Sequence, residues 1–216
     1  NLVASAGSNL DVGQIFTAGG GTLTYIIRES FLYFDTSPLD DGVVVAAATL
    51  ELYLAQDTTD TDFTVEARTH TWSPSVGTAD WVPGASLGAL TLRATLNTSG
   101  IGTTGAYKSF TDVATAAAVD RAGLTELILC SSRHRGNNAP TDNEHVSFQD
   151  ADNAGTTQDP KLTVLQPATV TGAGSAAWSA WSASAQGVRR RLGLFNSFWT
   201  SWNVVAAGKP VVLGAG

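Results

Sequence analysis

The chain has 216 residues, a formal net charge of −7, 22 glycines and only 14% charged residues. This length accommodates one good-sized domain with an appendage, or two small domains, and the composition favours turns and half-buried strands over charged helices. The composition argues against several classes of protein: no apolar run is long enough to span a membrane, the acidic charge disfavours nucleic acid as a partner, and the single cysteine excludes an internal disulfide.

The first predicted strands cover residues 12–17, 22–28 and 31–35. The third of them, Phe31-Leu-Tyr-Phe-Asp35, is mostly apolar and is followed by Thr36-Ser37-Pro38. Asp40-Asp41-Gly42 then predicts a turn, because aspartate hydrogen-bonds nearby backbone and glycine tolerates a positive φ.

Alternation of apolar and polar residues predicts the next two strands, at 48–54 and 63–68. Successive side chains of a strand point to opposite faces, so each strand presents one apolar face. We expect these faces to meet in a common core between two antiparallel sheets. The core-facing residues are Leu50, Leu52, Leu54, Phe63 and Val65.

The rest of the first 166 residues predicts more short strands and one helix. Asp112–Gly123 is the helical candidate, since Asp112 can cap it, an alanine run favours it and Gly123 can end it. The fold class is therefore all-β: an antiparallel β-sandwich of jelly-roll type with one short helix. The remaining candidate strands are 89–95, 106–110, 125–131, 144–149 and 161–166.

A break in charge and composition near Pro167 predicts two parts. Residues 1–166 hold all 19 acidic residues and eight of the 12 Lys and Arg, a net charge of −11. Residues 167–216 have no acid, a net charge of +4 and four of the six tryptophans. We interpret residues 1–166 as the sandwich body and residues 167–216 as a basic, Trp-rich C-terminal assembly arm.

The arm permits two local structures. Apolar residues at helical spacing favour a helix between Gly187 and Gly208, whereas alternation at Ala177–Ala185 and Phe198–Val205 favours strands that add to a sheet. We favour extended structure, because Ser, Trp and Val suit strands better. The helically spaced residues are Val188, Leu192, Phe195, Trp199 and Trp202.

Catalytic signals are weak, and we predict no catalytic residue, metal or cofactor. Gly84-Ala-Ser86-Leu-Gly88 fits a nucleophile-elbow pattern, but a strand-like segment follows it where that motif needs a helix. The three histidines are scattered, and the acidic loops at 57–62 and 150–155 are interpreted as solvated, with a structural calcium as the alternative.

Two tryptophans of the body, Trp72 and Trp81, are candidate sugar-stacking residues, since an exposed ring can lie on the apolar face of a sugar. Burial at the end of a sandwich is the commoner role of such a residue. The two interpretations stay open at this point.

Several motifs together resemble a known family. Phe31-Leu-Tyr-Phe-Asp-Thr-Ser, then Asp-Asp-Gly and Ala48-Thr-Leu-Glu-Leu-Tyr53, resemble the opening of DNRLRE-type, carbohydrate-binding-module-like jelly rolls. Leu124–Ser132 is similar to a late strand of the family, and Asn143–Phe148 and Thr157–Val164 resemble its closing pair of strands, so the resemblance covers about residues 10–166. It implies a non-enzymatic module of the kind found in phage virion proteins and in secreted polysaccharide-active proteins.

These features predict a non-enzymatic virion structural protein: a phage capsid decoration (cement) or fibre-type protein at the virion surface, attached through its arm. Its partner would be a major capsid or other virion protein, and it would form homo-oligomers. The alternatives are an extracellular carbohydrate-binding module with a glycan partner, and a subunit of an extracellular filament joined by strand donation. The predicted partner-binding residues are Trp178, Trp181, Arg189, Arg190, Arg191, Phe195, Phe198, Trp199 and Trp202.

Overall fold

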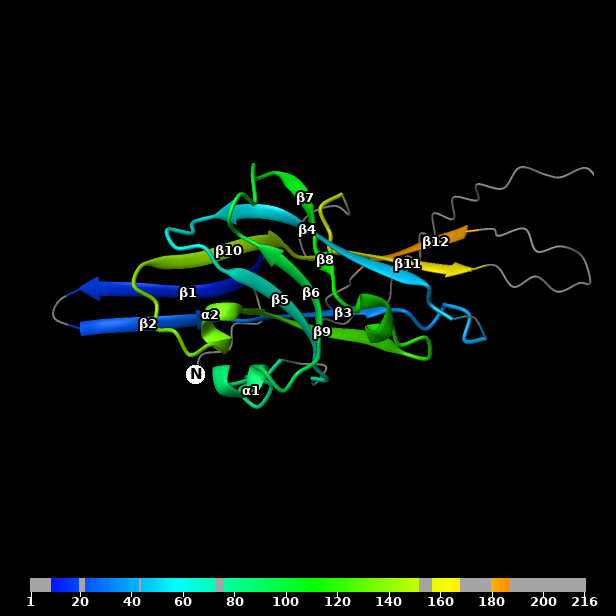
Figure 1. Cartoon of the computed structure of the whole chain (residues 1–216), viewed down its shortest axis with the longest axis horizontal. Helices are drawn as coiled ribbons and strands as arrows, with labels where there is room; N and C mark the ends of the chain where they lie inside the picture. The colour runs from blue at the N-terminus through cyan, green and yellow to red at the C-terminus, as the bar shows by residue number, and fades with distance from the viewer. Residues whose placement is uncertain are drawn as a thin grey trace, which may run out of the picture.

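The structure, a computed structural model, describes residues 9–19, 22–42, 44–72, 76–151, 157–167 and 180–186. Within them the chain is mostly β-strand, arranged in two antiparallel sheets between which it crosses repeatedly (Figure 1). The only helices in these residues are three single turns. The predicted all-β antiparallel sandwich is confirmed.

The larger sheet, which we call sheet A, has seven strands in the described part of the chain. Its order is β12-β11-β4-β10-β1-β2, and β7 also pairs with β4. These strands are β1 (Asn9–Gly19), β2 (Thr22–Arg28), β4 (Ala47–Asp57), β7 (Ala106–Ser109), β10 (Asn143–Gln149), β11 (Lys161–Pro167) and β12 (Ala180–Gln186).

The smaller sheet, sheet B, has five strands in the order β3-β9-β5-β6-β8. They are β3 (Ser30–Asp35), β5 (Thr64–Thr69), β6 (Leu92–Asn97), β8 (Thr111–Asp112) and β9 (Leu124–Ser131). The three single-turn helices are α1 (Gly84–Leu87), the 3₁₀ turn η1 (Thr115–Ala118) and α2 (Ser132–Arg135).

The core lies between the two sheets and is built as the alternation predicted. Leu50, Leu52 and Leu54 of β4 are completely buried, and they belong to the same apolar cluster as Phe63 and Val65. Sheet A supplies the leucines and sheet B supplies Val65, so the predicted common core between two antiparallel sheets is confirmed.

The outer face of sheet B is covered as well. The long connection from β5 to β6 carries α1 over this face, and Val82 and Leu87 of the connection pack on Ile128 and Cys130 of β9 in a second, smaller apolar cluster. The centre of sheet B, in β5 and β9, is therefore buried on both sides, and the side chains on this part of its outer face must satisfy their polar groups largely without water.

The predicted helix at Asp112–Gly123 is wrong. Asp112 does accept a hydrogen bond from the backbone N–H of Thr115 at 2.7 Å, but only the 3₁₀ turn Thr115–Ala118 follows, and Val119 is extended. The segment begins in β8, which pairs with β6, and its next two N–H groups donate to the carbonyl of Arg93. These tertiary bonds leave room for one turn, and a helix this short has little stability of its own.

The described part of the C-terminal arm is a strand, as favoured from the sequence. Strand β12 pairs antiparallel with β11 along its whole length, and Trp181 lies opposite Gln166 in the register. This strand forms one edge of sheet A (Figure 1). The other predicted arm residues lie outside the described part of the chain, namely Trp178, Arg189, Arg190, Arg191, Phe195, Phe198, Trp199 and Trp202.

Candidate functional site

Trp72, one of the two candidate sugar-stacking residues, is buried. It is 9% exposed, and its ring centroid lies 5.7 Å from those of both Phe31 and Tyr33 of β3. These two neighbours occupy much of the aromatic surface that a sugar would need. Trp72 therefore packs on the outer face of sheet B.

Trp81, the other candidate, is half-buried. Its ring centroid lies 5.4 Å from that of His134 in α2, with 31° between the ring planes. His134 is in turn held by Glu29, whose Oε1 lies 3.1 Å from the His134 Nδ1, and both of these side chains are buried. The Trp81 ring therefore packs against the imidazole of His134 in the one-turn helix α2, and Glu29 holds that imidazole in place.

Gly84 allows α1 to approach α2 closely at His134. A β-carbon on Gly84 would lie 2.2 Å from the carbonyl oxygen of His134 and 2.8 Å from its Cδ2. No larger residue fits there without a shift of the backbone. The Gly-x-Ser-x-Gly pattern is thus explained in part by packing: Gly84 touches α2, while Ser86 is exposed on a single helical turn that no strand directly precedes.

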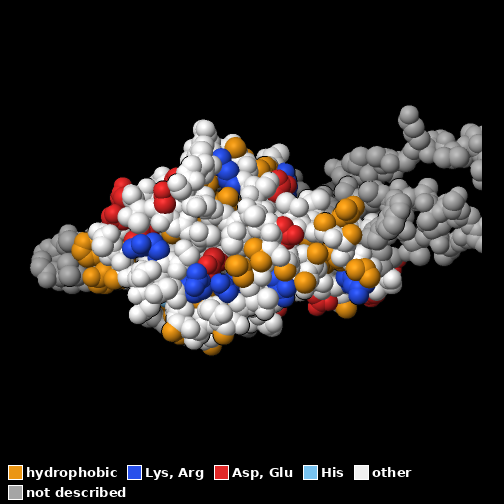
Figure 2. All heavy atoms as spheres, in the orientation of Figure 1, with side chains coloured by type: hydrophobic (Ala, Val, Ile, Leu, Met, Phe, Trp, Pro, Cys, Tyr) orange, Lys and Arg blue, Asp and Glu red, His pale blue; other side chains and the backbone are white. Residues whose placement is uncertain are grey.

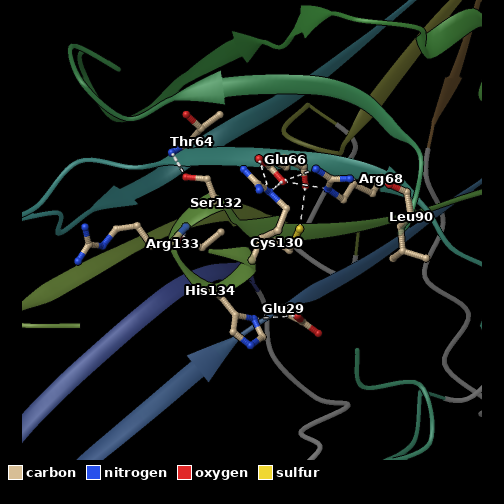
Figure 3. Close-up of polar contacts among 11 residues, drawn as sticks. Glu29, Thr64, Glu66, Arg68, Leu90, Cys130, Ser132, Arg133 and His134 are labelled. Carbon is tan, nitrogen blue, oxygen red and sulfur yellow. Dashed lines mark hydrogen bonds and ion pairs between the residues drawn. The ribbon is translucent and has the colours of Figure 1, made fainter. Parts of the chain in front are cut away.

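A charged network lies on the covered outer face of sheet B (Figure 3). Glu66, at the centre of the network, accepts hydrogen bonds from the Nε of Arg68 at 2.9 Å and from the Nε of Arg135 at 2.9 and 3.0 Å. The side chains of Glu66 and Arg68 are 5% and 8% exposed, whereas that of Arg135 is 37% exposed. Arg68 also donates to the carbonyl of Leu90, which ties the connection between β5 and β6 to the sheet.

Cys130 lies next to this network, and its thiol has low reactivity. Its Sγ is 3.7 Å from the carbonyl oxygen of Glu66, and burial together with the charge of Glu66 raises the pKa of the thiol to about 12. Because the thiolate is the reactive form, Cys130 is a structural residue.

A second buried carboxylate, that of Glu144 in β10, joins α2 to sheet A. Its side chain is 0% exposed and lies 2.7 Å from the Nε of Arg133, and it accepts a 2.9 Å hydrogen bond from Gln14. The α2 turn therefore connects the two sheets, through Arg133 to sheet A and through Arg135 to sheet B.

Asp11, His145 and Ser147 form the closest approach to a catalytic triad in the described residues. Ser147 Oγ donates to Asp11 Oδ1 at 2.6 Å, and His145 Nε2 lies 3.3 Å from the same oxygen and 3.4 Å from Ser147 Oγ. A working triad has the imidazole between the serine and the carboxylate, using both ring nitrogens. Here one nitrogen meets both partners and the serine proton goes to Asp11, so His145 is not placed to activate Ser147.

The charge on Asp11 is stabilised by this arrangement. Burial raises the pKa of its carboxyl, but hydrogen bonds from His145 and Ser147 outweigh that effect and lower the pKa to about 2. Arg28 of β2 also forms an ion pair with it. The set is a polar brace between β1, β2 and β10.

Asp150 and Asp159 are two further buried acids, 1% and 5% exposed. Burial, followed by the charge of Asp150, raises the pKa of Asp159 to about 6, while Lys161 acts in the opposite direction. The Nζ of Lys161 also lies 3.6 Å from the ring centroid of Tyr107, whose hydroxyl donates to the carbonyl of Asp159 at 2.9 Å.

Metal-ligand sets and membrane-spanning helices were sought in the same part of the chain. No group of three or more His, Cys, Asp or Glu side chains in the described ranges could hold a metal ion, and part of the 150–155 loop lies outside those ranges. In those ranges there is also no helix of the length and hydropathy needed to cross a membrane. His70, the third histidine, lies with its Nε2 3.3 Å from the carbonyl oxygen of Asp80.

Besides the single residues Val113 and Leu124, exposed apolar side chains occur at two places in the described residues. Tyr25 and Ile26 of β2 are 50% and 41% exposed, on a hairpin whose hydrophobic side chains are visible at one end of the molecule (Figure 2). The other place is an open groove of about 410 Å³ between the loop at Val44 and the η1 turn. The sequence pattern did not identify either site, although the lack of charge around Tyr25 is visible in the sequence.

Comparison with known proteins finds no match for this chain, either to a protein-family model or to a curated protein. The resemblance to DNRLRE-type jelly rolls therefore stays a prediction. The candidate sites stand on their geometry alone.

Proposed function

We propose that this protein is a non-enzymatic structural component of a virus particle, a phage capsid decoration (cement) or fibre-type protein attached at the virion surface through its C-terminal arm. The partner would be a major capsid or other virion protein. The arm's arginines would meet acidic or carbonyl-rich surface on it, and the arm's aromatic rings would be buried against it.

The observation that carries this proposal is the change of chemistry at the end of the body. Sheet A ends in β12, a strand drawn from the Trp-rich segment. Residues 187–216 follow it and contain four basic residues, three of them consecutive, and no acid, whereas residues 1–166 have a net charge of −11. A basic aromatic segment that follows the edge strand of an acidic body suits attachment to a separate surface.

The internal pairing of the body's charges supports a non-enzymatic role. Glu66, Glu144 and Glu29 each pair with an arginine or histidine of the same chain. Each pair is buried, or has one buried member, and braces strands, α2 or the connection that covers sheet B. Side chains used in this way support the scaffold and do not face a substrate.

Incorporation into particles tests the proposal. Chains lacking residues 187–216 keep β12 and should fold, but they should be absent from purified particles when produced in place of the full chain. Replacing Arg189, Arg190 and Arg191 together by alanine should reduce incorporation in a salt-dependent manner. A matched control is Lys108→Ala, which removes one positive charge from the body. Normal incorporation of the shortened chain would contradict the proposal.

Glycan binding is the second candidate, and Trp81 is the observation that favours it. A half-buried ring supported by His134 could stack on a sugar face, whereas Trp72 is buried. A glycan array probed with the full chain and with Trp81→Ala tests this directly. Binding that Trp81→Ala abolishes, with the fold retained by circular dichroism, would favour a carbohydrate-binding module over a particle component.

A further inference from the structure

The hairpin of β1 and β2 extends beyond the rest of sheet A (Figure 1). Strand β1 pairs with β10 only as far as Ile15, which lies opposite Asn143. From Phe16 to Gly19 it pairs with β2 alone, so this part of the hairpin is a two-stranded ribbon in the described residues. Such ribbons are marginally stable in water without a third strand or a covering element.

Apolar side chains lie on both faces of this ribbon. Phe16 and Tyr25 are opposite each other in the register, with ring centroids 5.5 Å apart. Ile15 and Ile26 form the next pair, on the other face, at the base of the ribbon, where Ile15 still pairs with Asn143 of β10. Tyr25 and Ile26 are about half exposed. In the described residues β2 pairs with β1 alone, and a protruding apolar strand with such an edge is a ready template for another strand.

The ribbon is uncharged, which indicates what kind of strand it receives. Residues 12–27 form 16 consecutive positions without Asp, Glu, Lys or Arg, within a body whose net charge is −11. Two copies of so acidic a body repel each other over most of their surface. They can approach closely here, because the charges that flank this segment in the sequence, Asp11 and Arg28, neutralise each other in an ion pair.

We propose that β2 pairs antiparallel with β2 of a second copy across a two-fold axis, so that the two A sheets become one continuous sheet. With the axis at Tyr25, the middle residue of Thr22–Arg28, each Arg28 lies opposite a Thr22 and no like charges meet. The same strand serves on both sides, as a two-fold interface requires. This contact is separate from the C-terminal arm and does not depend on the function proposed above.

The mass of the full chain in solution tests the contact. Sedimentation velocity should give a dimer, twice 22.4 kDa. Tyr25→Lys places two positive charges opposite each other at the axis and should give the monomer mass, and Ile26→Lys should weaken the dimer. Val113→Lys is the matched control, since Val113 is 52% exposed elsewhere on the body, and it should leave the dimer intact.

A cross-link tests the register even if the lysine variants fail to fold. Residues directly opposite in an antiparallel pair have Cα atoms about 4.5–5.5 Å apart, within the range of a disulfide. Tyr25→Cys should therefore form a disulfide-linked dimer on mild oxidation, whereas Val113→Cys should not. The native Cys130 is buried and should not interfere.

Three outcomes would overturn the proposal: a full chain that is monomeric, a dimer that Tyr25→Lys leaves unchanged, or a dimer lost only when residues 187–216 are removed. Unchanged mass in a chain lacking residues 187–216 supports it. Loss of the dimer on removing residues 1–8 alone would mean that the amino-terminal segment, and not β2, makes the contact. Particle incorporation is a separate measurement, so failure of either proposal is recognised independently.

Discussion

The charged network on the outer face of sheet B should be a sensitive point for stability, and Glu66→Ala is the change that tests it. The substitution leaves Arg68 buried without its carboxylate, because the Arg68 side chain is only 8% exposed. Breaking a buried ion pair by removing one partner costs about 3–5 kcal/mol. We expect a loss of that size in the free energy of unfolding, measured by urea denaturation of the full chain.

Two further variants separate burial from charge. Arg135 also contacts Glu66, but its side chain is 37% exposed, so Arg135→Ala should cost no more than about 1 kcal/mol. The double variant Glu66→Leu with Arg68→Met removes both buried charges and replaces them with apolar volume. It should recover most of the loss, because such replacements are often neutral or stabilising. A Glu66→Ala loss below about 1 kcal/mol, or an equal loss for Arg135→Ala, would refute the reasoning.

Two other predictions concern the core and the pH dependence of stability. Leu50→Ala should cost about 2–5 kcal/mol in the free energy of unfolding, since Leu50 is completely buried, whereas Leu124→Ala at a 46% exposed position should cost about 0.5 kcal/mol or less. The pKa of Asp159 is raised from 3.8 to about 6, so its protonated form stabilises the native state, and this contribution is lost as the pH rises from about 4 to about 6. This pH-dependent loss in the free energy of unfolding is at most about 3 kcal/mol. It should disappear in Asp159→Asn, as measured by urea denaturation at a series of pH values. An unchanged pH profile in that variant would contradict it.

The core could be predicted from sequence because its pattern is local. Leu50, Leu52 and Leu54 alternate with polar residues, so one face of β4 had to be buried whatever the topology. The helix prediction at Asp112–Gly123 failed for the converse reason. Its capping residue and alanines are local signals, but the bonds from the segment's backbone to Arg93 depend on how distant strands come together.

On the outer face of sheet B, the alternation of apolar and polar residues predicts the wrong environment for the polar side chains of β5. Phe63, Val65 and Ala67 alternate with Thr64, Glu66 and Arg68, a pattern typical of a strand with one face in water. The structure buries the side chains of Glu66 and Arg68 to 5% and 8% exposure, because the connection between β5 and β6 folds back over them. Nothing in the strand itself signals a cover supplied by another segment, so the charged network could not be located from the sequence.

The asymmetry between the two sheets bears on assembly. Sheet B is covered on both faces at its centre, and α2 ties it to sheet A through Arg133 and Arg135. Sheet A ends in β2 on one side and β12 on the other, and in the described residues each of these strands pairs with a single neighbour. The two edges differ in chemistry, which fits different partners. An uncharged, self-complementary strand suits a second copy of the same chain, whereas a strand followed by a basic aromatic segment suits a surface of different composition.

A body with both contacts would attach to a particle in pairs, and each bound arm would hold its partner's arm near the surface. Attachment would then be stronger than one arm provides, so Tyr25→Lys should weaken retention on particles without touching the arm.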